Sequence, residues 1–257
     1  MAELPDLTVF AQILSRRFKG KTLETLEVSI AKKINVTAKE LKKALEGRQL
    51  INVDRVGKTL QLSFSGSQVL GLHLMLRGEL VLIDQDEPPR FQILGFHFEG
   101  GEAFALIDMQ KQATPTLNPE KVEVPDALDM DIDYFRALLA KKRTVIKTLL
   151  MDQHKIRGIG NSYSDEILYH AGISPFSIAG AIPEKAIKKL FKSISTVLDK
   201  AIKEISEENG NELRGELRDF MVIHNPELKE TSKGEKIQTG KIGGRKTYYT
   251  DKQELFE

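Results

Sequence analysis

The sequence predicts an α+β protein in which an antiparallel β-rich region comes first and a helical region second. Between about residues 23 and 116, short apolar stretches are separated by Gly, Pro, Ser and Asp, a pattern typical of closely spaced antiparallel strands. After Asp131 the apolar residues recur with the period of a helix instead. A chain of 257 residues is long enough for two domains, so we expect an N-terminal sandwich or barrel and a C-terminal helical domain.

Two helices are expected within the N-terminal region. Pro5 and Gly20 suit the start and the end of the first, and a second short helix is expected from Thr37 to Gly47. Four apolar residues give the first helix its buried face: Leu7, Phe10, Leu14 and Phe18. The clearest strand patterns are TLQLSF (59–64), SQVLGLHL (67–74), ELVLID (79–84), RFQILGFHF (90–98) and EAFALID (102–108).

The helical region has five amphipathic stretches on which apolar residues share one face. They are YFRALLAK (134–141), TVIKTLLMDQ (144–153), SYSDEILYHAG (162–172), the long stretch 183–205 and NELRGELRDFMVI (211–223). The predicted borders are a first domain over 1–118, a linker over 119–130, a helical domain over 131–225 and a tail over 226–257. The tail ends in IGGRKTYYT, which predicts a hairpin with a Gly-Gly turn.

The composition excludes several classes of protein. There is no cysteine, which excludes disulfides, thiol catalysis and zinc sites built on thiolates. No apolar run approaches the roughly 18 residues of a membrane span, and the N-terminus has no basic region of the kind that opens a secretory signal. We therefore expect an intracellular, cytoplasmic protein without a membrane partner. The formal charge of +1 does not by itself indicate a nucleic-acid binder.

The most informative local motif is KIRGIGNSYSDEIL, residues 155–168. Two glycines lead into Asn161, an N-cap type of residue, so a Gly-rich turn feeds a helix N-terminus that could bind an anion. Basic residues on both sides of this turn suit a phosphate backbone. They are Lys141, Lys142, Arg143, Lys147, Lys155 and Arg157. A capped corner between two helices and an ordinary solvated charged face remain the alternatives.

Together with MAELPDL, RVGKTLQL, LHLMLRGEL and IGGRKTYYT, this motif resembles the formamidopyrimidine-DNA glycosylase and endonuclease VIII (Fpg/Nei) family. The matches run in the family's order from residue 2 to about 253. The resemblance implies an N-terminal β-sandwich with flanking helices, a helix-two-turn-helix domain and a C-terminal finger. It also implies a monomer that acts on damaged DNA and, in a bacterium, is associated with the nucleoid.

In the family the catalytic residue is an N-terminal proline, exposed when the initiator methionine is removed, and here Ala2 takes its place. A terminal amine has a pKa of about 7.7 to 8.0 against about 10.4 for lysine, so it suits an attack on C1′ of the sugar to form a Schiff base. By resemblance Glu3 moves protons and Lys58 contacts the phosphate of the lesion. The chemistry requires that Met1 is removed.

The resemblance assigns flanking phosphates to Lys147, Asn161 and Arg245. The loop that fills the vacated duplex in the family corresponds to residues 108–113, where Lys111 is followed by Gln112 and the aromatic wedge is missing. We therefore expect base extrusion from intact duplex to be less favourable. The position of a void-filling methionine is occupied by Leu76.

The family's four zinc cysteines correspond to Glu230, Lys233, Thr250 and Gln253, so we predict a finger without zinc and no metal or other cofactor. Such a hairpin would be held by packing of side chains such as Ile237, Ile242, Tyr248 and Tyr249. The five histidines show no metal-binding spacing, and His73 in its apolar strand suits a core imidazole. None of them is assigned to catalysis.

The favoured hypothesis is a base-excision-repair DNA glycosylase with abasic-site lyase activity that works through the N-terminal amine. The expected substrates are oxidised pyrimidines, abasic sites or damage in single strands rather than 8-oxoguanine, because the segment after Phe220 is short for the loop that closes over that base. The alternative is a relative that binds damaged double- or single-stranded DNA without cutting it. An RNA-binding or protein-interaction module is a third possibility.

Overall fold

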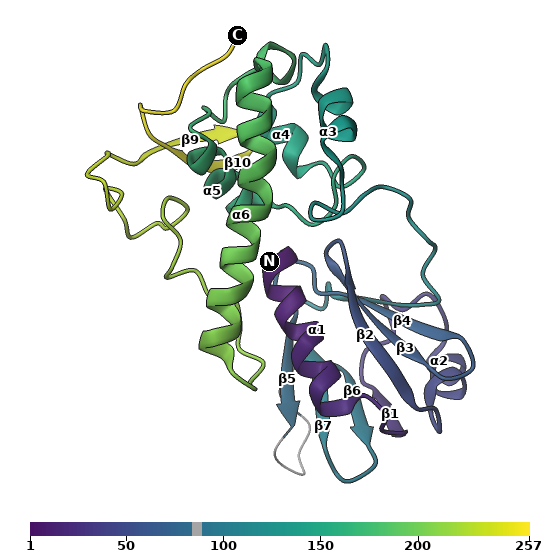
Figure 1. The fold of residues 1–257 in the computed structure, drawn as a ribbon. Coiled ribbons are helices and arrows are strands. Elements are labelled where there is room, and N and C mark those ends of the chain that lie inside the picture. The colour runs from purple at the N-terminus through teal and green to yellow at the C-terminus, as the bar shows by residue number, and fades with distance from the viewer. Residues whose placement is uncertain (84–88) are drawn as a thin grey trace. The chain divides into compact units, whose positions relative to one another are not determined.

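The structure, a computed structural model, describes residues 1–83 and 89–257; Asp84, the last residue of one predicted strand, lies outside them. The chain forms two compact units. The first contains Met1–Val122 and Ile205–Leu217, and the second contains Glu123–Glu204 and Arg218–Glu257 (Figure 1). The segment Ile205–Leu217 thus groups with the β-rich unit, whereas the predicted borders assigned it to the helical domain.

The first unit consists of two four-stranded antiparallel sheets, as expected for a sandwich, with the strand orders β1-β6-β7-β5 and β2-β3-β4-β8. Apolar residues of both sheets and of helix α1 belong to one core cluster. The elements are α1 (Leu4–Phe18), β1 (Leu23–Val28), α2 (Ala38–Leu45), β2 (Leu50–Val56), β3 (Thr59–Phe64), β4 (Gln68–His73), β5 (Glu79–Ile83), β6 (Gln92–Phe98), β7 (Ala103–Ile107) and β8 (Thr114–Leu117).

Both helices of this unit confirm the predictions from their end signals. In α1, Pro5 lies in the first turn, and the backbone N–H of the N-cap residue Glu3 donates to Asp6 at 2.9 Å. In α2, the hydroxyl of Thr37 accepts a bond from the Glu40 N–H at 3.2 Å. These bonds satisfy N–H groups that a helix start leaves without partners inside the helix.

The second unit contains the helices and one hairpin. Its elements are α3 (Ile132–Leu139), α4 (Ile146–Met151), α5 (Asn161–Ala171), the 3-10 helix η1 (Ala179–Ala181), most of α6 (Glu184–Asn209), β9 (Gln238–Ile242) and β10 (Arg245–Tyr249). The fifth predicted helix, over 211–223, is wrong, because those residues form turns and irregular backbone. Gly215 lies in its middle, and a mid-helix glycine costs about 1 kcal/mol relative to alanine.

The hairpin β9–β10 has the predicted Gly-Gly turn. Gly243 and Gly244 have φ angles of 56° and 77°, the left-handed conformation that a two-residue hairpin turn of this kind requires. The predicted packing of the hairpin is confirmed for Ile242 and Tyr248, which are buried. Tyr249 makes an edge contact with the ring of Phe176 at 5.1 Å.

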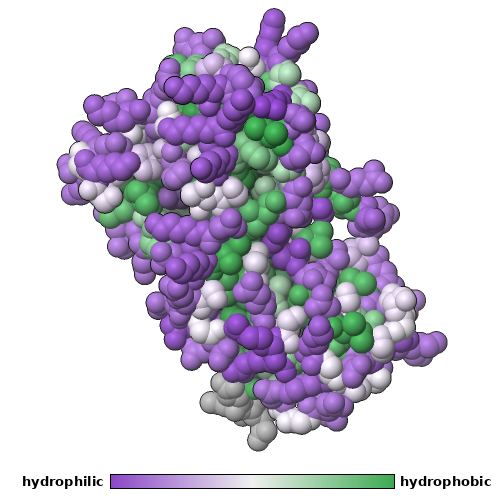
Figure 2. All heavy atoms as spheres, in the orientation of Figure 1, coloured by the Kyte–Doolittle hydropathy of each residue, from purple (hydrophilic) through white to green (hydrophobic). Residues whose placement is uncertain are grey.

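Within the described ranges, no helix combines the length and apolar character needed to cross a membrane. The face of the molecule in Figure 2 is largely hydrophilic, with separate hydrophobic patches between the charged side chains.

Candidate active site and nucleic-acid interface

The chain's first residues are buried where helix α1 begins. Ala2 is 7% exposed and Glu3 is 2% exposed. Glu3 is the N-cap residue of α1 and therefore lies at the positive end of the helix dipole. Ala2 thus lies at the wall of a cavity, and the buried acid Glu3 follows it in the chain.

This cavity has a volume of about 380 Å³ and is formed by the first unit alone. Its lining comes from the N-terminus and α1, from the segment between β4 and β5 together with the start of β5, and from the segment after α6. The lining residues are Met1, Ala2, Phe10, Leu74, Leu76, Arg77, Gly78, Glu79, Leu80, Arg214, Gly215 and Glu216. Two of the predicted site residues, Ala2 and Leu76, therefore share one cavity.

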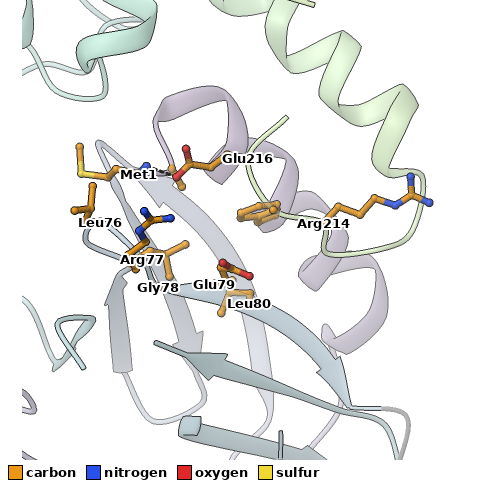
Figure 3. A pocket seen from close by; sticks show the side chains of 12 residues that line it. Met1, Leu76, Arg77, Gly78, Glu79, Leu80, Arg214 and Glu216 are labelled. Carbon is orange, nitrogen blue, oxygen red and sulfur yellow. Dashed lines mark ion pairs between the residues drawn. The ribbon is translucent and has the colours of Figure 1, made fainter. Parts of the chain in front are cut away.

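Charged groups of both signs line this cavity. The ammonium group of Met1 forms an ion pair with Glu216, which Figure 3 marks with a dashed line. Arg77 and Glu79 lie on the wall contributed by the segment around Gly78 (Figure 3). While Met1 is present, its amine is paired with the carboxylate of Glu216. The nitrogen of Ala2, the expected nucleophile, is then part of a peptide bond and is not a free amine.

Lys58 lies in the turn between β2 and β3, and it is partly exposed. Thr59 pairs with His73, so Lys58 is at the strand end from which the cavity segment 74–78 leaves. Burial lowers the pKa of the His73 imidazole, and the positive charge of Lys58 lowers it further. Nδ1 of His73 accepts a bond from the Met75 N–H at 3.1 Å, which requires that nitrogen to be unprotonated. In this conformation the imidazole of His73 supports the backbone at the start of the segment 74–78.

The loop that follows β7 holds Lys111 and Gln112, both exposed. The carboxylate of Asp108, only 1% exposed, accepts bonds from the backbone N–H groups of Gln110, Gln112 and Ala113 at 2.8, 2.6 and 2.8 Å. The loop therefore has a defined conformation and presents its side chains outward.

In the second unit, Asn161 and Arg245 come from α5 and β10. Asn161 is the first residue of α5 rather than its N-cap, which is Gly160, so the predicted capping role is wrong. Its side-chain amide instead donates to the carbonyl of Lys246 at 3.1 Å. This bond holds β10 next to the start of α5, while the side chain of Arg245 is exposed.

Lys147 has no exposed surface and pairs with the equally buried Asp165 at 2.7 Å. Its amine also donates to the hydroxyl of Thr247 at 2.9 Å. A cation without accessible surface does not reach a phosphate in this conformation. The structure therefore favours a positioning role for Lys147 over the direct phosphate contact expected from the sequence.

Two acids of α5 complete this buried network, and neither was predicted from the sequence. Asp165 also accepts bonds from the ring of His224 at 2.7 Å and from the Tyr248 N–H at 3.0 Å. Glu166 accepts three backbone N–H bonds, from Val222, Ile223 and His224, although burial raises the pKa of its carboxyl. The only sequence signal was an adjacent acid pair inside an amphipathic helix.

The residues at the family's zinc positions do not fit the metal. The side-chain oxygen of Gln253 accepts a bond from the Thr250 N–H at 2.8 Å, and its amide nitrogen donates to Ile173 at 2.8 Å. Neither residue offers a thiolate or an imidazole. Among the described residues, no group of three or more potential His, Cys, Asp or Glu ligands is gathered.

Comparison with known proteins agrees with this architecture. Residues 1–114 match the formamidopyrimidine-DNA glycosylase N-terminal domain, and residues 122–210 match the formamidopyrimidine-DNA glycosylase H2TH domain. These matches define a two-part DNA glycosylase fold. The chain belongs to the formamidopyrimidine-DNA glycosylase family.

Relatives and solved structures cover most of the chain. The formamidopyrimidine-DNA glycosylase of Carboxydothermus hydrogenoformans is 31% identical over 77% of this chain and 76% of its own. That of Mycoplasma mobile is 28% identical over 98% of both chains. The Lactococcus lactis Fpg in complex with DNA containing an abasic site has a TM-score of 0.86 and 26% identity, and the match covers 97% of this chain and 98% of that one.

Proposed function

We propose that this protein is a DNA glycosylase of base-excision repair with abasic-site lyase activity, which acts on damaged or abasic DNA. The observation that carries the proposal is the position of Ala2 in the wall of a cavity, followed by the buried acid Glu3. Family membership supports the same activity. The Lactococcus lactis protein was solved with DNA containing an abasic site, and a mutant of it was solved with DNA containing Fapy-dG.

The nucleophile is the amine of Ala2 after removal of Met1. This amine attacks C1′ of the damaged nucleotide; the bond from C1′ to the base breaks, and the base leaves with a proton. Opening of the sugar ring then gives a protonated imine between Ala2 and C1′. Glu3, next to the amine, donates the proton that the ring oxygen needs and can accept one later.

The imine is an electron sink for strand cleavage. Loss of a proton from C2′ expels the phosphate on the 3′ side, and hydrolysis of the imine releases the free amine. Lys58 contacts the phosphate of the lesion, while Asn161 and Arg245 bind flanking phosphates. Alanine supplies a primary amine whose imine must stay protonated, so we expect slower chemistry than with a proline.

The polar groups of the cavity suit the binding of a damaged base with polar edges. Arg77 offers a planar set of donors to carbonyl oxygens, and Glu79 and Glu216 offer acceptors to N–H groups. We therefore propose oxidised pyrimidines, abasic sites and single-stranded damage as the preferred substrates. A DNA substrate implies a location in the compartment that holds the DNA.

The test is borohydride trapping on a duplex with one abasic site, read by mass spectrometry together with the intact mass of the free protein. We expect an adduct on Ala2 in protein that lacks Met1, and none on Ala2 in protein that retains it. Methionine-free protein that binds the duplex but gives no adduct would contradict the lyase activity and favour a binder that does not cut.

A further inference from the structure

A second cavity lies within the second unit, where a hydrogen bond of 2.9 Å between Nδ1 of His170 and the hydroxyl of Ser193 joins α5 to α6 (Figure 1). Its volume is about 330 Å³, within the range of about 300 to 1,000 Å³ typical of small-molecule sites. All of its lining residues belong to the second unit, so this unit alone forms it. We call it the α5–α6 cavity. It shares no lining residue with the cavity at Ala2.

The α5–α6 cavity lies on one face of α5, and the contacts of this helix with β10 lie on another. Tyr163, Glu166 and His170 line the cavity, and their spacing of three and four residues places them on the same side of the helix. Asn161 and Asp165, which are four residues apart, instead form hydrogen bonds with β10. The cavity is therefore separate from the residues proposed to bind phosphates of the DNA.

The wall of the cavity is largely apolar and is held in place by hydrogen bonds. Its apolar residues come from α6 and from the segment 220–222: Val197, Ala201, Phe220, Met221 and Val222. The carboxylate of Glu166 accepts bonds from the N–H groups of residues 222–224 at 3.1, 2.8 and 2.7 Å, so this segment is fixed against α5. Tyr163 and Tyr169 add two aromatic rings to that of Phe220, and such rings favour contact with the ring of a ligand.

Two lysines bring positive charge to the cavity. Lys200 of α6 and Lys233 of the segment before β9 both line it, and both are exposed. Among the residues that the structure describes, neither ammonium group has a carboxylate partner. Burial lowers the pKa of the His170 imidazole in the same lining, and the positive charges of Lys189, Lys233 and Lys200 lower it further. Cations thus determine the electrostatic potential at this end of the cavity.

Two carboxylates belong to the same region, and each has partners other than these lysines. Both oxygens of Glu166 accept backbone N–H bonds. Glu235 acts on the hydroxyl of Tyr169, and its Oε2 accepts a bond from the Thr250 hydroxyl at 3.3 Å. The negative charge that would pair with the two lysines therefore has to come from a bound molecule.

We propose that the α5–α6 cavity is a second ligand site of this protein, for a small aromatic molecule that carries one carboxylate, sulfonate or phosphate group. The ring packs against the apolar wall, and Lys200 and Lys233 bind the anionic group. An apolar pocket with a few convergent polar groups is the usual form of such a site. The site does not depend on the glycosylase activity, because no residue of the Ala2 cavity takes part in it.

The test uses the full-length protein and benzenesulfonate as the probe, with the ring signals of His170 followed by NMR. We expect a dissociation constant of about 1 mM or below. The pKa of His170 should rise in the complex, because a bound anion favours the protonated imidazole. Two matched probes separate the ring from the charge: methanesulfonate lacks the ring, benzenesulfonamide lacks the charge, and each should bind about tenfold or more weakly.

Variants of the lining locate the site. Lys200→Gln and Lys233→Gln should each weaken the binding of benzenesulfonate by about tenfold, the effect of one charge-assisted hydrogen bond. Val197→Phe fills the cavity without a change of charge and should also weaken binding by about tenfold or more. The matched control is Lys192→Gln, which removes an exposed lysine of α6 outside the lining and should change the affinity by less than about twofold. Thermal unfolding of each variant verifies that the fold is intact.

The absence of any change in the His170 signals up to about 10 mM benzenesulfonate would overturn the proposal. Equal binding of methanesulfonate or of benzenesulfonamide would overturn it too, and so would equal losses in the Lys192 and Lys200 variants. If the variants of Lys200 and Lys233 lose affinity for duplex DNA while the wild type does not bind the probe, the two lysines belong to the DNA interface instead. Borohydride trapping on Ala2 tests the proposed function separately from all of these results.

Discussion

The cavity of the first unit and the network around Asp165 in the second unit use charge in opposite ways. In the first, the charged residues of the cavity remain accessible: Glu216 is 36% exposed, and Arg77 and Glu79 are exposed as well. In the second, Lys147 and Asp165 have no exposed surface at all. Accessible charges can meet a substrate, whereas buried charges are occupied in holding backbone segments together. The role of a cation in such a motif therefore depends on whether its side chain is buried or exposed.

The largest effect expected from this comparison is on the buried pair. Lys147→Met keeps the length of the side chain but leaves Asp165 in the protein interior without its cation. Removing one partner of a buried ion pair costs about 3 to 5 kcal/mol. We expect a loss of that size in the free energy of unfolding, measured by urea denaturation.

Lys155→Met provides the matched control, because Lys155 is an exposed lysine of the same unit. It should change the unfolding free energy by less than about 0.5 kcal/mol. A Lys147 variant as stable as this control, with weaker DNA binding, would restore the direct phosphate contact that the sequence suggested.

Arg245 is an exposed cation of the second unit, so it tests whether an accessible charge there binds DNA. Arg245→Ala should weaken duplex binding by about tenfold, because a hydrogen bond to a charged group contributes about 1.5 to 3 kcal/mol. The slope of log K against log salt should become shallower by about 0.9, the value for one phosphate contact. The free energy of unfolding should not change.

The control is Lys252→Ala, which removes an exposed cation beyond β10. A salt slope that changes equally in both variants would mean that the hairpin acts through its general charge rather than through Arg245.

The smallest effect concerns His73, a partly buried titrating group of the first unit. Its pKa in the folded protein is lowered from 6.5 by burial and by Lys58. The unfolded chain therefore takes up a proton that the folded protein does not. This contribution to stability is present above about pH 6.5 and is lost as the pH falls below that value.

We expect the unfolding free energy of the wild type to fall more steeply between pH 7 and pH 5 than that of His73→Gln. His154→Gln, at an exposed position, should follow the wild-type curve. His170, whose pKa is also lowered, chiefly by burial, contributes in the same direction in all three proteins, so it cancels in the comparison. Parallel curves for the His73 variant and the wild type would contradict the lowered pKa of His73.

Local signals predicted the elements whose cause is local. Pro5 and Gly20 marked the ends of α1, and the Gly-Gly pair marked the hairpin turn, since each acts through its own backbone angles. The helix predicted over 211–223 failed because Gly215 lies in its middle and the N–H groups of residues 222–224 bond to Glu166 of α5 instead of to the preceding turn. Asn161 failed as a cap because the helix already includes it and Gly160 is the N-cap, while its side-chain amide bonds to β10.

By itself, the sequence determined the order of strands and helices, the family and the replacement of the N-terminal proline by Ala2. Only the tertiary structure decided that Lys147 is buried while Arg245 is exposed. The physical reason is that capping and periodicity act over a few residues, whereas burial and strand register depend on segments far apart in the chain. Ile107 and Glu79 pair across 28 positions, and no short motif encodes that contact.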